Sequence, residues 1–536
     1  MRFSEKTRNR AFRFGLIAAP ALFVASACGD QNLKHADQSQ NAAVAGGAIS
    51  FARSFDVRLR PIRDNGGEIT AIDVQSTLSG FLTPDSGPFS LAAPVVYAGV
   101  AGIADRVEGL TVADAEGAVP LVQEDDPAAP GGFPYFRHWR AQREVSFPVT
   151  ISYRSLVQPA GARNGPPFGI RPSAGGVSGA GSGFLVVPEN TDSSASHVAW
   201  DLSGMAEGSA GIASFGEGES TLKGPPRELM QAWYMAGPVG RYPDSGDVDG
   251  FSAAWLGDFP FDERIEMERA GEIYAFLGEF FEYLDPPPRY RVFMRLMQTP
   301  PYGGGTALPN SFMLSRGPAQ PADAGSEGPR GVFFHEMIHQ WVGGIEGPQG
   351  VTSWFSEGLT TYYTNLLPMR GGFATVDDYG AGINATARAY YTNPARNWTA
   401  QRIAETGFGD EAVRHRPYQL GALYFADLDS KLRAASGGKR TLHRFVRETF
   451  SRRESEEGFT FDQAKWKELV SAEIGPDAGD YFDQHVIEGK TLIPAPDAFG
   501  PCFERRAVKF ETEDGSVDGF EWTRVAAVSD EECRKY

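Results

Sequence analysis

Two patterns of hydrophobic residues divide this chain of 536 residues. Up to about residue 225, apolar and polar residues alternate in short runs such as 55–60 (FDVRLR) and 149–153 (VTISY), separated by turns rich in glycine and proline. A period of two predicts strands with one buried face. The apolar run 184–187 is also interpreted as a strand. We therefore expect an antiparallel β domain over residues 49–225.

The pattern changes beyond residue 226. Apolar residues recur with helical spacing over 261–284, the run 290–296 (YRVFMRL) predicts a strand, and further helices are expected over 418–434 and 441–450. Helices dominate to about residue 490. The two runs around Asp514 and Gly515 predict a small β-hairpin segment over 491–536. The fold class is therefore α+β, with a β domain followed by a mainly helical domain over 226–490.

One stretch of the β domain, residues 159–183, is unusually rich in glycine and proline. A loop of this length is either mobile or a lid over a neighbouring cleft. We expect a mobile loop.

The first residues have the features of an export signal. Several arginines precede an apolar stretch over 14–24, and small residues follow directly before Cys28. This pattern predicts a secretory signal peptide, and the apolar stretch is too short to span a membrane comfortably. The small residues before Cys28 resemble the bacterial lipobox, in which the cysteine is acylated and becomes the new amino terminus. The alternative is an ordinary cleavage site with a coincidental cysteine.

The following residues, 29–48, are rich in Gln, Asn, Ala, Ser and Gly, which is typical of a flexible tether. With residues 1–28 as a lipoprotein-type signal peptide, the expectation is an exported bacterial cell-envelope protein. It would be a periplasmic lipoprotein, held at the outer membrane through its lipid anchor.

The composition of the chain limits the classes of molecule that it is expected to bind. Hydrophobic residues make up 41% of the chain, which supports sizeable cores, and the net charge is -18 at pH 7. A strongly acidic surface argues against binding to nucleic acid, whose phosphates attract basic proteins. We expect no nucleic-acid partner.

The segment HEMIH, residues 335–339, carries the clearest chemical signal. Residues four apart on an α-helix differ by roughly 40° around the axis, so His335 and His339 present both imidazoles to one point. That arrangement suits a zinc ion. Glu336 lies about 100° away on the same helix, displaced from the metal but near enough to accept a proton from a water bound to it. The alternative is a histidine pair buried in a core without a metal.

A catalytic zinc takes three protein ligands and keeps one position open. Glu357, in the segment WFSEGL, is the candidate for the third ligand. The glycine-rich stretch 343–350 ends the first helix, and Thr352 or Ser353 can cap a second one running to about residue 367. Two helices joined by a short loop would bring Glu357 back to the histidines. The sequence thus predicts one Zn²⁺ ion and hydrolysis by an activated water.

The runs HEMIHQWVGG and WFSEGLTTYY resemble the gluzincin zinc metallopeptidases, namely the aminopeptidase N-like and the glycyl aminopeptidase-like families. His339 and Glu357 enclose 17 residues, one fewer than in the aminopeptidase N-like family. The spacing therefore favours the glycyl aminopeptidase-like family, with the other as runner-up. The resemblance implies a thermolysin-like catalytic domain that hydrolyses peptides or proteins.

Two weaker segments add to the resemblance. YQLG, at 418–421, is similar to the family segment Tyr-x-Lys-Gly, which implies that the hydroxyl of Tyr418 stabilises the oxyanion. The segment 302–311 is similar to the family's strand before the zinc helix, but Ala307 stands where the family carries a glutamate for the substrate's amino terminus. An aminopeptidase is expected, whereas this departure leaves an endopeptidase or an enzyme that recognises another terminus open. A non-catalytic peptide-binding lipoprotein is the third alternative.

The sequence leaves two interpretations open for three further residues. Cys502 and Cys533 close one disulfide if the chain enters an oxidising periplasm, or remain two free surface thiols. His415 is either a partner of Tyr418 or part of a solvated basic cluster with its neighbouring arginines, and we favour the solvated cluster.

Overall fold

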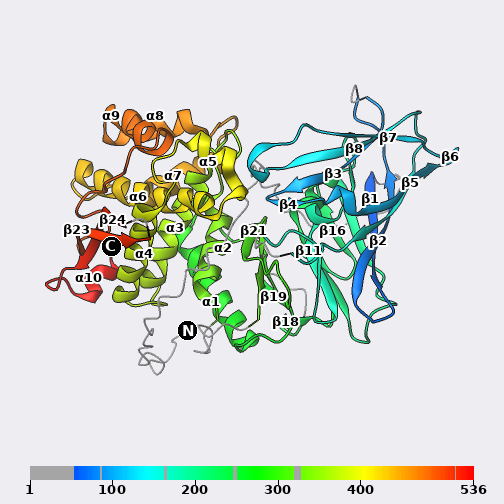
Figure 1. Ribbon diagram of the computed structural model, residues 1–536, viewed down its shortest axis with the longest axis horizontal. Helices are drawn as coiled ribbons and strands as arrows, with labels where there is room; N and C mark the ends of the chain where they lie inside the picture. The colour runs from blue at the N-terminus through cyan, green and yellow to red at the C-terminus, as the bar shows by residue number, and fades with distance from the viewer. Residues whose placement is uncertain (1–52, 85–86, 162–165, 246–249, 319–327, 514) are drawn as a thin grey trace.

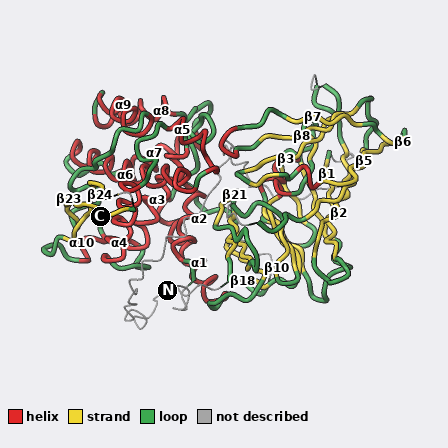
Figure 2. The backbone as a smooth tube through the Cα atoms, in the orientation of Figure 1, coloured by secondary structure: helices red, strands yellow, loops and turns green. Residues whose placement is uncertain are grey.

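Strands and helices occupy opposite halves of the molecule (Figures 1 and 2). The computed structural model of the protein describes residues 53–84, 87–161, 166–245, 250–318, 328–513 and 515–536. The strand-rich half comes first in the chain and the helical half follows, so the predicted α+β class is confirmed. The expected signal peptide, the lipobox cysteine Cys28 and the tether lie outside the described residues.

A seven-stranded sheet, in the order β16-β13-β1-β2-β9-β5-β6, forms one layer of the β half. In β1, Phe55, Val57 and Leu59 are buried while the residues between them are exposed, which is the predicted alternation. The pairs are antiparallel except β1–β13, which is parallel, as the long connection between the two strands permits. The strand bounds are β1 (Ser54–Arg63), β2 (Ile69–Ser79), β5 (Val107–Asp114), β6 (Gly117–Ala118), β9 (Val149–Leu156), β13 (Ala195–Trp200) and β16 (Ser220–Lys223).

Two five-stranded sheets complete this half. One has the order β12-β3-β8-β7 with β4 beside β3, and the other has the order β10-β11-β17-β14-β15. Because β17 is a wholly buried strand of the second sheet, the β half extends past the expected boundary at residue 225. The bounds are β3 (Ser90–Tyr97), β4 (Val100–Ala101), β7 (Leu121–Asp125), β8 (Tyr135–Ala141), β10 (Arg171–Ser173), β11 (Gly176–Ala180), β12 (Val187–Pro188), β14 (Ala210–Ala213), β15 (Gly216–Glu217) and β17 (Trp233–Gly237).

The prediction of a mobile loop over 159–183 is wrong for residues 166–183. Residues 171–180 form the β10–β11 hairpin, of which only the tip, Ala174 and Gly175, is exposed, and the flanking residues 166–170 and 181–183 are buried. Their glycines serve close packing: a Cβ on Gly181 would lie 2.0 Å from the carbonyl oxygen of Leu229. The expected strand over 184–187 is also wrong, since only its last residue enters a strand, β12, and the others are buried beyond a strand.

A third five-stranded sheet, in the order β18-β19-β20-β22-β21, joins the two halves. Alternate residues of β20 face opposite ways: Val292 packs into the helical core, and Phe293 packs against Trp233 of the β half. Helices α1 and α2 therefore cover one face of this sheet. The bounds are β18 (Gly240–Tyr242), β19 (Phe251–Leu256), β20 (Tyr290–Leu296), β21 (Gly305–Leu308), β22 (Ser311–Arg316), α1 (Glu263–Phe281) and α2 (Arg330–Val342).

The helical half packs around α3 and α6, which cross its centre (Figure 1). Side-chain oxygens cap several of these helices, as when Thr375 accepts from the backbone N–H of Asp378. The helices are α3 (Ser353–Arg370), α4 (Val376–Thr392), α5 (Ala400–Thr406), α6 (Glu411–Ser436), α7 (Leu442–Ser455), α8 (Gln463–Ile474), α9 (Asp477–Phe482) and α10 (Asp530–Arg534). Within the described ranges, no helix has both the length and the apolar character of a membrane span.

The last residues fold onto the helical half. Strands β23 (Phe503–Thr512) and β24 (Gly515–Arg524) form a hairpin that packs on α4, where Asn384 exchanges two hydrogen bonds of 2.8 and 2.9 Å with the backbone of Trp522. A disulfide joins Cys502, before the hairpin, to Cys533 in α10. The segment after residue 490 is therefore anchored covalently and by hydrogen bonds.

Candidate metal centre and active site

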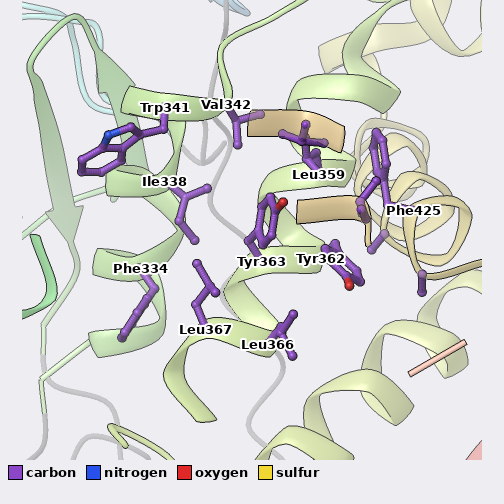
Figure 3. Packing of buried hydrophobic residues seen from close by; sticks show 14 of the residues in the cluster. Phe334, Ile338, Trp341, Val342, Leu359, Tyr362, Tyr363, Leu366, Leu367 and Phe425 are labelled. Carbon is purple, nitrogen blue, oxygen red and sulfur yellow. The ribbon is translucent and has the colours of Figure 1, made fainter. Parts of the chain in front are cut away.

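Helix α2 has two faces with different tasks. Phe334, Ile338 and Trp341 recur at helical spacing and point into the core shared with α3 (Figure 3). His335 and His339 are one residue further along the helix than Phe334 and Ile338, so their rings emerge on an adjacent face. Packing of the apolar face thus fixes the direction of both imidazoles.

Helix α3 repeats this division. Leu359, Tyr362, Tyr363, Leu366 and Leu367 face the common core in Figure 3. Positions 357, 360 and 364 follow one another at spacings of three and four residues, so Glu357 and two threonines share another face. That face is turned toward the histidines of α2.

The structure brings the three predicted ligands together. Glu357 Oε2 lies 3.5 Å from His335 Nε2 and 3.4 Å from His339 Nε2, and one ligand atom from each residue lies within 4.8 Å of the others. Donors about 2.1 Å from the centre of a tetrahedron stand about 3.4 Å apart, which is the geometry of a zinc ion bound to imidazole and carboxylate. The donor set and its spacing therefore fit one zinc ion.

Two threonines hold the imidazoles, and the sequence analysis missed both. Thr360 Oγ1 lies 3.3 Å from His339 Nδ1, and Thr364 Oγ1 lies 3.4 Å from His335 Nδ1. Thr364 donates its own proton to the Thr360 carbonyl at 2.8 Å, so its lone pairs face the ring. His335 then carries its proton on Nδ1 and turns a lone pair on Nε2 toward the metal position. The spacing of the threonines from Glu357 was the available signal.

Burial sets the protonation of the same groups. It lowers the pKa of His339 to about 3 and also lowers the pKa of His335, so both rings are neutral, the form that binds metal. Burial, followed by the charge of Glu357, holds the pKa of Glu336 well above its usual range, while the backbone N–H of Ala307 opposes the rise. A divalent cation held at these ligands would favour the ionised carboxylates.

Tyr418 lies beside the metal position. Its ring is stacked on that of His335 with centroids 5.8 Å apart, and its hydroxyl is one of the groups that lower the pKa of Glu357 against the effect of burial. The hydroxyl is therefore adjacent to the ligand atoms, where it can donate a hydrogen bond to the carbonyl oxygen of a bound peptide.

Helix α6 begins at Glu411, earlier than the expected start at Tyr418. Asp410 caps it by accepting from the backbone N–H of Val413, and Pro417 lies inside the helix. Pro417 therefore does not mark the start of this helix, although proline is common in the first turn.

The comparisons with known proteins agree with this geometry. Residues 329–419, which span α2, α3 and the start of α6, match the family model described as M61 glycyl aminopeptidase. Over these residues the chain is similar to the gluzincin family, and this match together with the ligand geometry indicates a zinc metallopeptidase. No curated protein sequence matches it.

Solved structures share the fold of this metallopeptidase over most of its length. An aminopeptidase N family protein from Idiomarina loihiensis has a TM-score of 0.64 at 14% identity, covering 86% of this chain and 80% of its own. A mutant of an M1 zinc metallopeptidase from Deinococcus radiodurans, bound to a Tyr-Ser-Ala substrate, has a TM-score of 0.50 at 18% identity, covering 83% and 96%. At these identities the likeness shows the fold alone.

The interpretation of His415 as part of a solvated cluster is wrong. The side chain is buried and its ring meets the Tyr418 ring edge-on, with centroids 5.7 Å apart. Burial, followed by the charge of Arg414, lowers its pKa to about 3. The neutral ring of His415 thus packs against the ring of Tyr418.

The strand that precedes the zinc helix lies against the site as expected. Thr306 and Ala307 are in β21, the edge strand of the joining sheet, and both are buried. The backbone N–H of Ala307 acts on Glu336 by lowering its pKa, and Ala307 has no acidic side chain. The position expected to hold a substrate's amino group is therefore apolar in this metallopeptidase.

Proposed function

We propose that this zinc metallopeptidase is an aminopeptidase that acts on peptides in the cell envelope. The observation that carries the proposal is the convergence of two neutral imidazoles and one carboxylate beside a second, non-ligating carboxylate, Glu336. A site used only to bind peptide has no use for a proton acceptor there. The aminopeptidase description of the matched model and of the first solved neighbour supports the finer class.

The residues divide the chemistry between them. His335, His339 and Glu357 would hold a zinc ion, which when bound would supply a water molecule of lowered pKa and a Lewis acid for the peptide carbonyl. Glu336 accepts the water's proton and delivers it to the nitrogen of the leaving amine. Tyr418 donates to the carbonyl oxygen as charge develops there, a contribution on the order of 3 kcal/mol for one well-placed donor.

A phenylalanine variant tests the role of Tyr418 in catalysis. Tyr418→Phe removes one hydroxyl and keeps the ring stacked on His335, so we expect zinc to stay bound and kcat to fall roughly 10²- to 10³-fold. Full kcat in this variant would remove Tyr418 from the mechanism.

Ala307 supports an endopeptidase as the second candidate, because no acidic side chain stands at the position expected to hold a free amino group. The test is digestion of matched peptides with free and acetylated amino termini, with cleavage positions mapped by mass spectrometry and Glu336→Gln as the blank. Trimming of free termini alone supports the aminopeptidase, and internal cleavage of both sets supports the endopeptidase. Full zinc content with no cleavage of either set would leave a peptide-binding protein.

The proposal also includes the location of the protein, which is the cell envelope, with a lipid anchor at Cys28. Its support is the basic and apolar pattern before Cys28 and the presence of a disulfide between Cys502 and Cys533, which suits an oxidising compartment. Fractionation of cells expressing the full chain or its Cys28→Ser variant tests it. We expect the full chain in the membrane fraction with incorporated fatty acid, and the variant released from that fraction without it. Equal distribution of the two would exclude the lipid anchor.

A further inference from the structure

A pocket opens beside the metal centre between the two halves of the molecule. Tyr97 and Phe133 contribute from the β half, and Ile403 and Phe408 contribute from the α5 region. Glu357 and Tyr418 also line it, so the pocket is continuous with the proposed site of peptide hydrolysis. A substrate residue next to the cleaved bond can therefore enter it.

The pocket is mostly apolar, but it contains one guanidinium. Arg414 lies four residues before Tyr418 on α6, so the two side chains project from the same face of the helix into the pocket. Its guanidinium contacts the neighbouring residue, His415: the distance from Arg414 Nη2 to His415 Nε2 is 3.5 Å. Its Nε is buried without a hydrogen-bond partner, and no ion pair involves Arg414 among the described residues.

Other arginines of α6 differ in this respect. Arg416 donates to backbone carbonyls, including that of Trp398 at 3.3 Å, and Arg433 forms an ion pair with Asp429 at 2.8 Å. Arg414 has neither kind of partner in the described chain. The acid that acts on it electrostatically is Glu357, whose oxygen is a metal ligand in the proposed site.

Apart from Glu357, no acidic residue of the part of the chain that the structure describes lines the pocket beside Arg414. His415 is a neutral ring, and the pocket residues from α5 and from the β half, such as Ile403 and Phe133, are apolar. A charge beside apolar surface is costly unless an opposite charge pairs with it. A planar guanidinium matches a carboxylate, which can accept two parallel hydrogen bonds from it.

We propose that Arg414 binds a carboxylate of the substrate, so that the enzyme prefers peptides with an anionic group on the residue that enters this pocket. The inference rests on the proposed function for the identity of the ligand as a peptide. The carboxylate is either the side chain of Asp or Glu or the free carboxyl terminus of a dipeptide. Ala307 is consistent with this proposal. At position 307 the site has no carboxylate to bind an amino group, whereas Arg414 supplies a cation that can bind a carboxylate.

The test compares substrates that differ only in charge. Peptides with Glu or Gln on either side of the cleaved bond test the side-chain source, and dipeptides with a free or amidated carboxyl terminus test the terminal source. A charge-assisted hydrogen bond corresponds to roughly 10- to 100-fold in affinity, so we expect kcat/KM to be higher by about that factor for the anionic member of one pair. Equal kcat/KM in both pairs for the unmodified enzyme overturns the proposal.

Variants assign the preference to Arg414. We expect Arg414→Met to reduce the ratio of anionic to neutral kcat/KM to near 1, and Arg414→Lys to retain part of it. Arg402, an exposed arginine of α5 stacked on Trp398, provides the matched control, and Arg402→Met should leave the ratio unchanged. Zinc content and circular dichroism establish that each variant is folded. An unchanged ratio in folded Arg414→Met would contradict the assignment.

A binding measurement separates this inference from the proposed function. Zinc-loaded Glu336→Gln protein is titrated calorimetrically with the same Glu and Gln peptides and dipeptide pairs. Tighter binding of the anionic member supports the carboxylate site even if the unmodified protein cleaves no peptide, in which case only the proposed function fails. Equal affinities within both pairs overturn the carboxylate site whatever the catalytic result.

Discussion

The metal centre depends on which side chains carry a proton. Burial keeps His335 and His339 neutral, and Thr364 selects the tautomer of His335 that leaves Nε2 free to bind a cation. Glu336 is buried next to the same position without being one of the ligands. Ligation and proton transfer are therefore assigned to different residues, and substitutions should separate them.

Glu336→Gln replaces the proposed proton acceptor with a neutral group of the same shape. We expect a loss of kcat of at least about 10²- to 10⁴-fold, which is the usual contribution of a positioned acid or base, with zinc content unchanged. Zinc analysis and peptide hydrolysis measure the two effects. His339→Ala is the companion variant and should lose both metal and activity. Retained turnover in zinc-loaded Glu336→Gln would exclude Glu336 as the base.

Thr360→Val should weaken metal binding without touching a ligand, because it removes the hydroxyl that faces His339 Nδ1. Loss of such an outer partner typically costs 10- to 100-fold in metal affinity. Competition with a chelator of known affinity measures it. Thr361→Val, one residue away on another face of α3, is the matched control. Equal zinc affinity in the two variants would refute the role of Thr360.

At the scale of elements, the site requires α3 and α6 to approach closely. Gly358, next to Glu357, meets Gly421, three residues after Tyr418: a Cβ on Gly358 would lie 2.4 Å from the Cα of Gly421. A Cβ on Gly421 would lie 2.3 Å from the carbonyl oxygen of Trp354. Both neighbours are backbone atoms, which cannot rotate away. The two glycines thus set the distance between the third ligand and the tyrosine.

Gly421→Ala should therefore force the helices apart. Overpacking of this kind costs roughly 1–3 kcal/mol of stability, and the shift should also lower kcat because Tyr418 moves with α6. Urea unfolding and peptide hydrolysis measure the two effects. Gly437→Ala at the end of α6 is a poor control because Gly437 is left-handed, with φ +61°, whereas Gly331→Ala in α2, with open space around it, is suitable. Equal stability and kcat in Gly421→Ala and Gly331→Ala would show that the helices do not need this approach.

At the scale of the whole molecule, buried histidines make stability depend on pH. His443 of α7 lies against Phe280 of α1 with ring centroids 4.0 Å apart, and burial lowers its pKa to about 4. In the unfolded chain a histidine has a pKa near 6.5. The stabilisation by the neutral ring is therefore complete above about pH 6.5, and it is lost as the pH falls because the unfolded chain binds the proton first.

His443→Phe should flatten this dependence. Each such histidine contributes a slope of about 1.4 kcal/mol per pH unit between its two pKa values, so the free energy of unfolding of the variant should fall by that much less per unit between about pH 6.5 and 4. Urea unfolding at several pH values measures the slope. His197→Phe, on the exposed face of β13, is the control and should keep the slope of the unmodified protein. Parallel curves for all three proteins would exclude His443 from the effect.

Local patterns determined much of this protein. The spacing of His335, Glu336 and His339 and the break before Glu357 were sufficient to predict a zinc site, because those residues lie on two consecutive helices whose geometry is regular. The period-two alternation of β1 likewise predicted its buried face. Such features depend on neighbours close in the chain, and the sequence shows those directly.

Only the tertiary structure decided the rest. Glycine composition over 159–183 predicted a loop, but Gly176, Gly179, Gly181 and Gly183 let backbones pack closely. Charge predicted a solvated His415, but the fold buries it beside Tyr418. A binding role for Arg414 could be inferred only from the structure, in which the β half forms the opposite wall of the pocket. Burial and pocket walls arise from segments hundreds of residues apart, and no local period in the chain encodes which of them will meet.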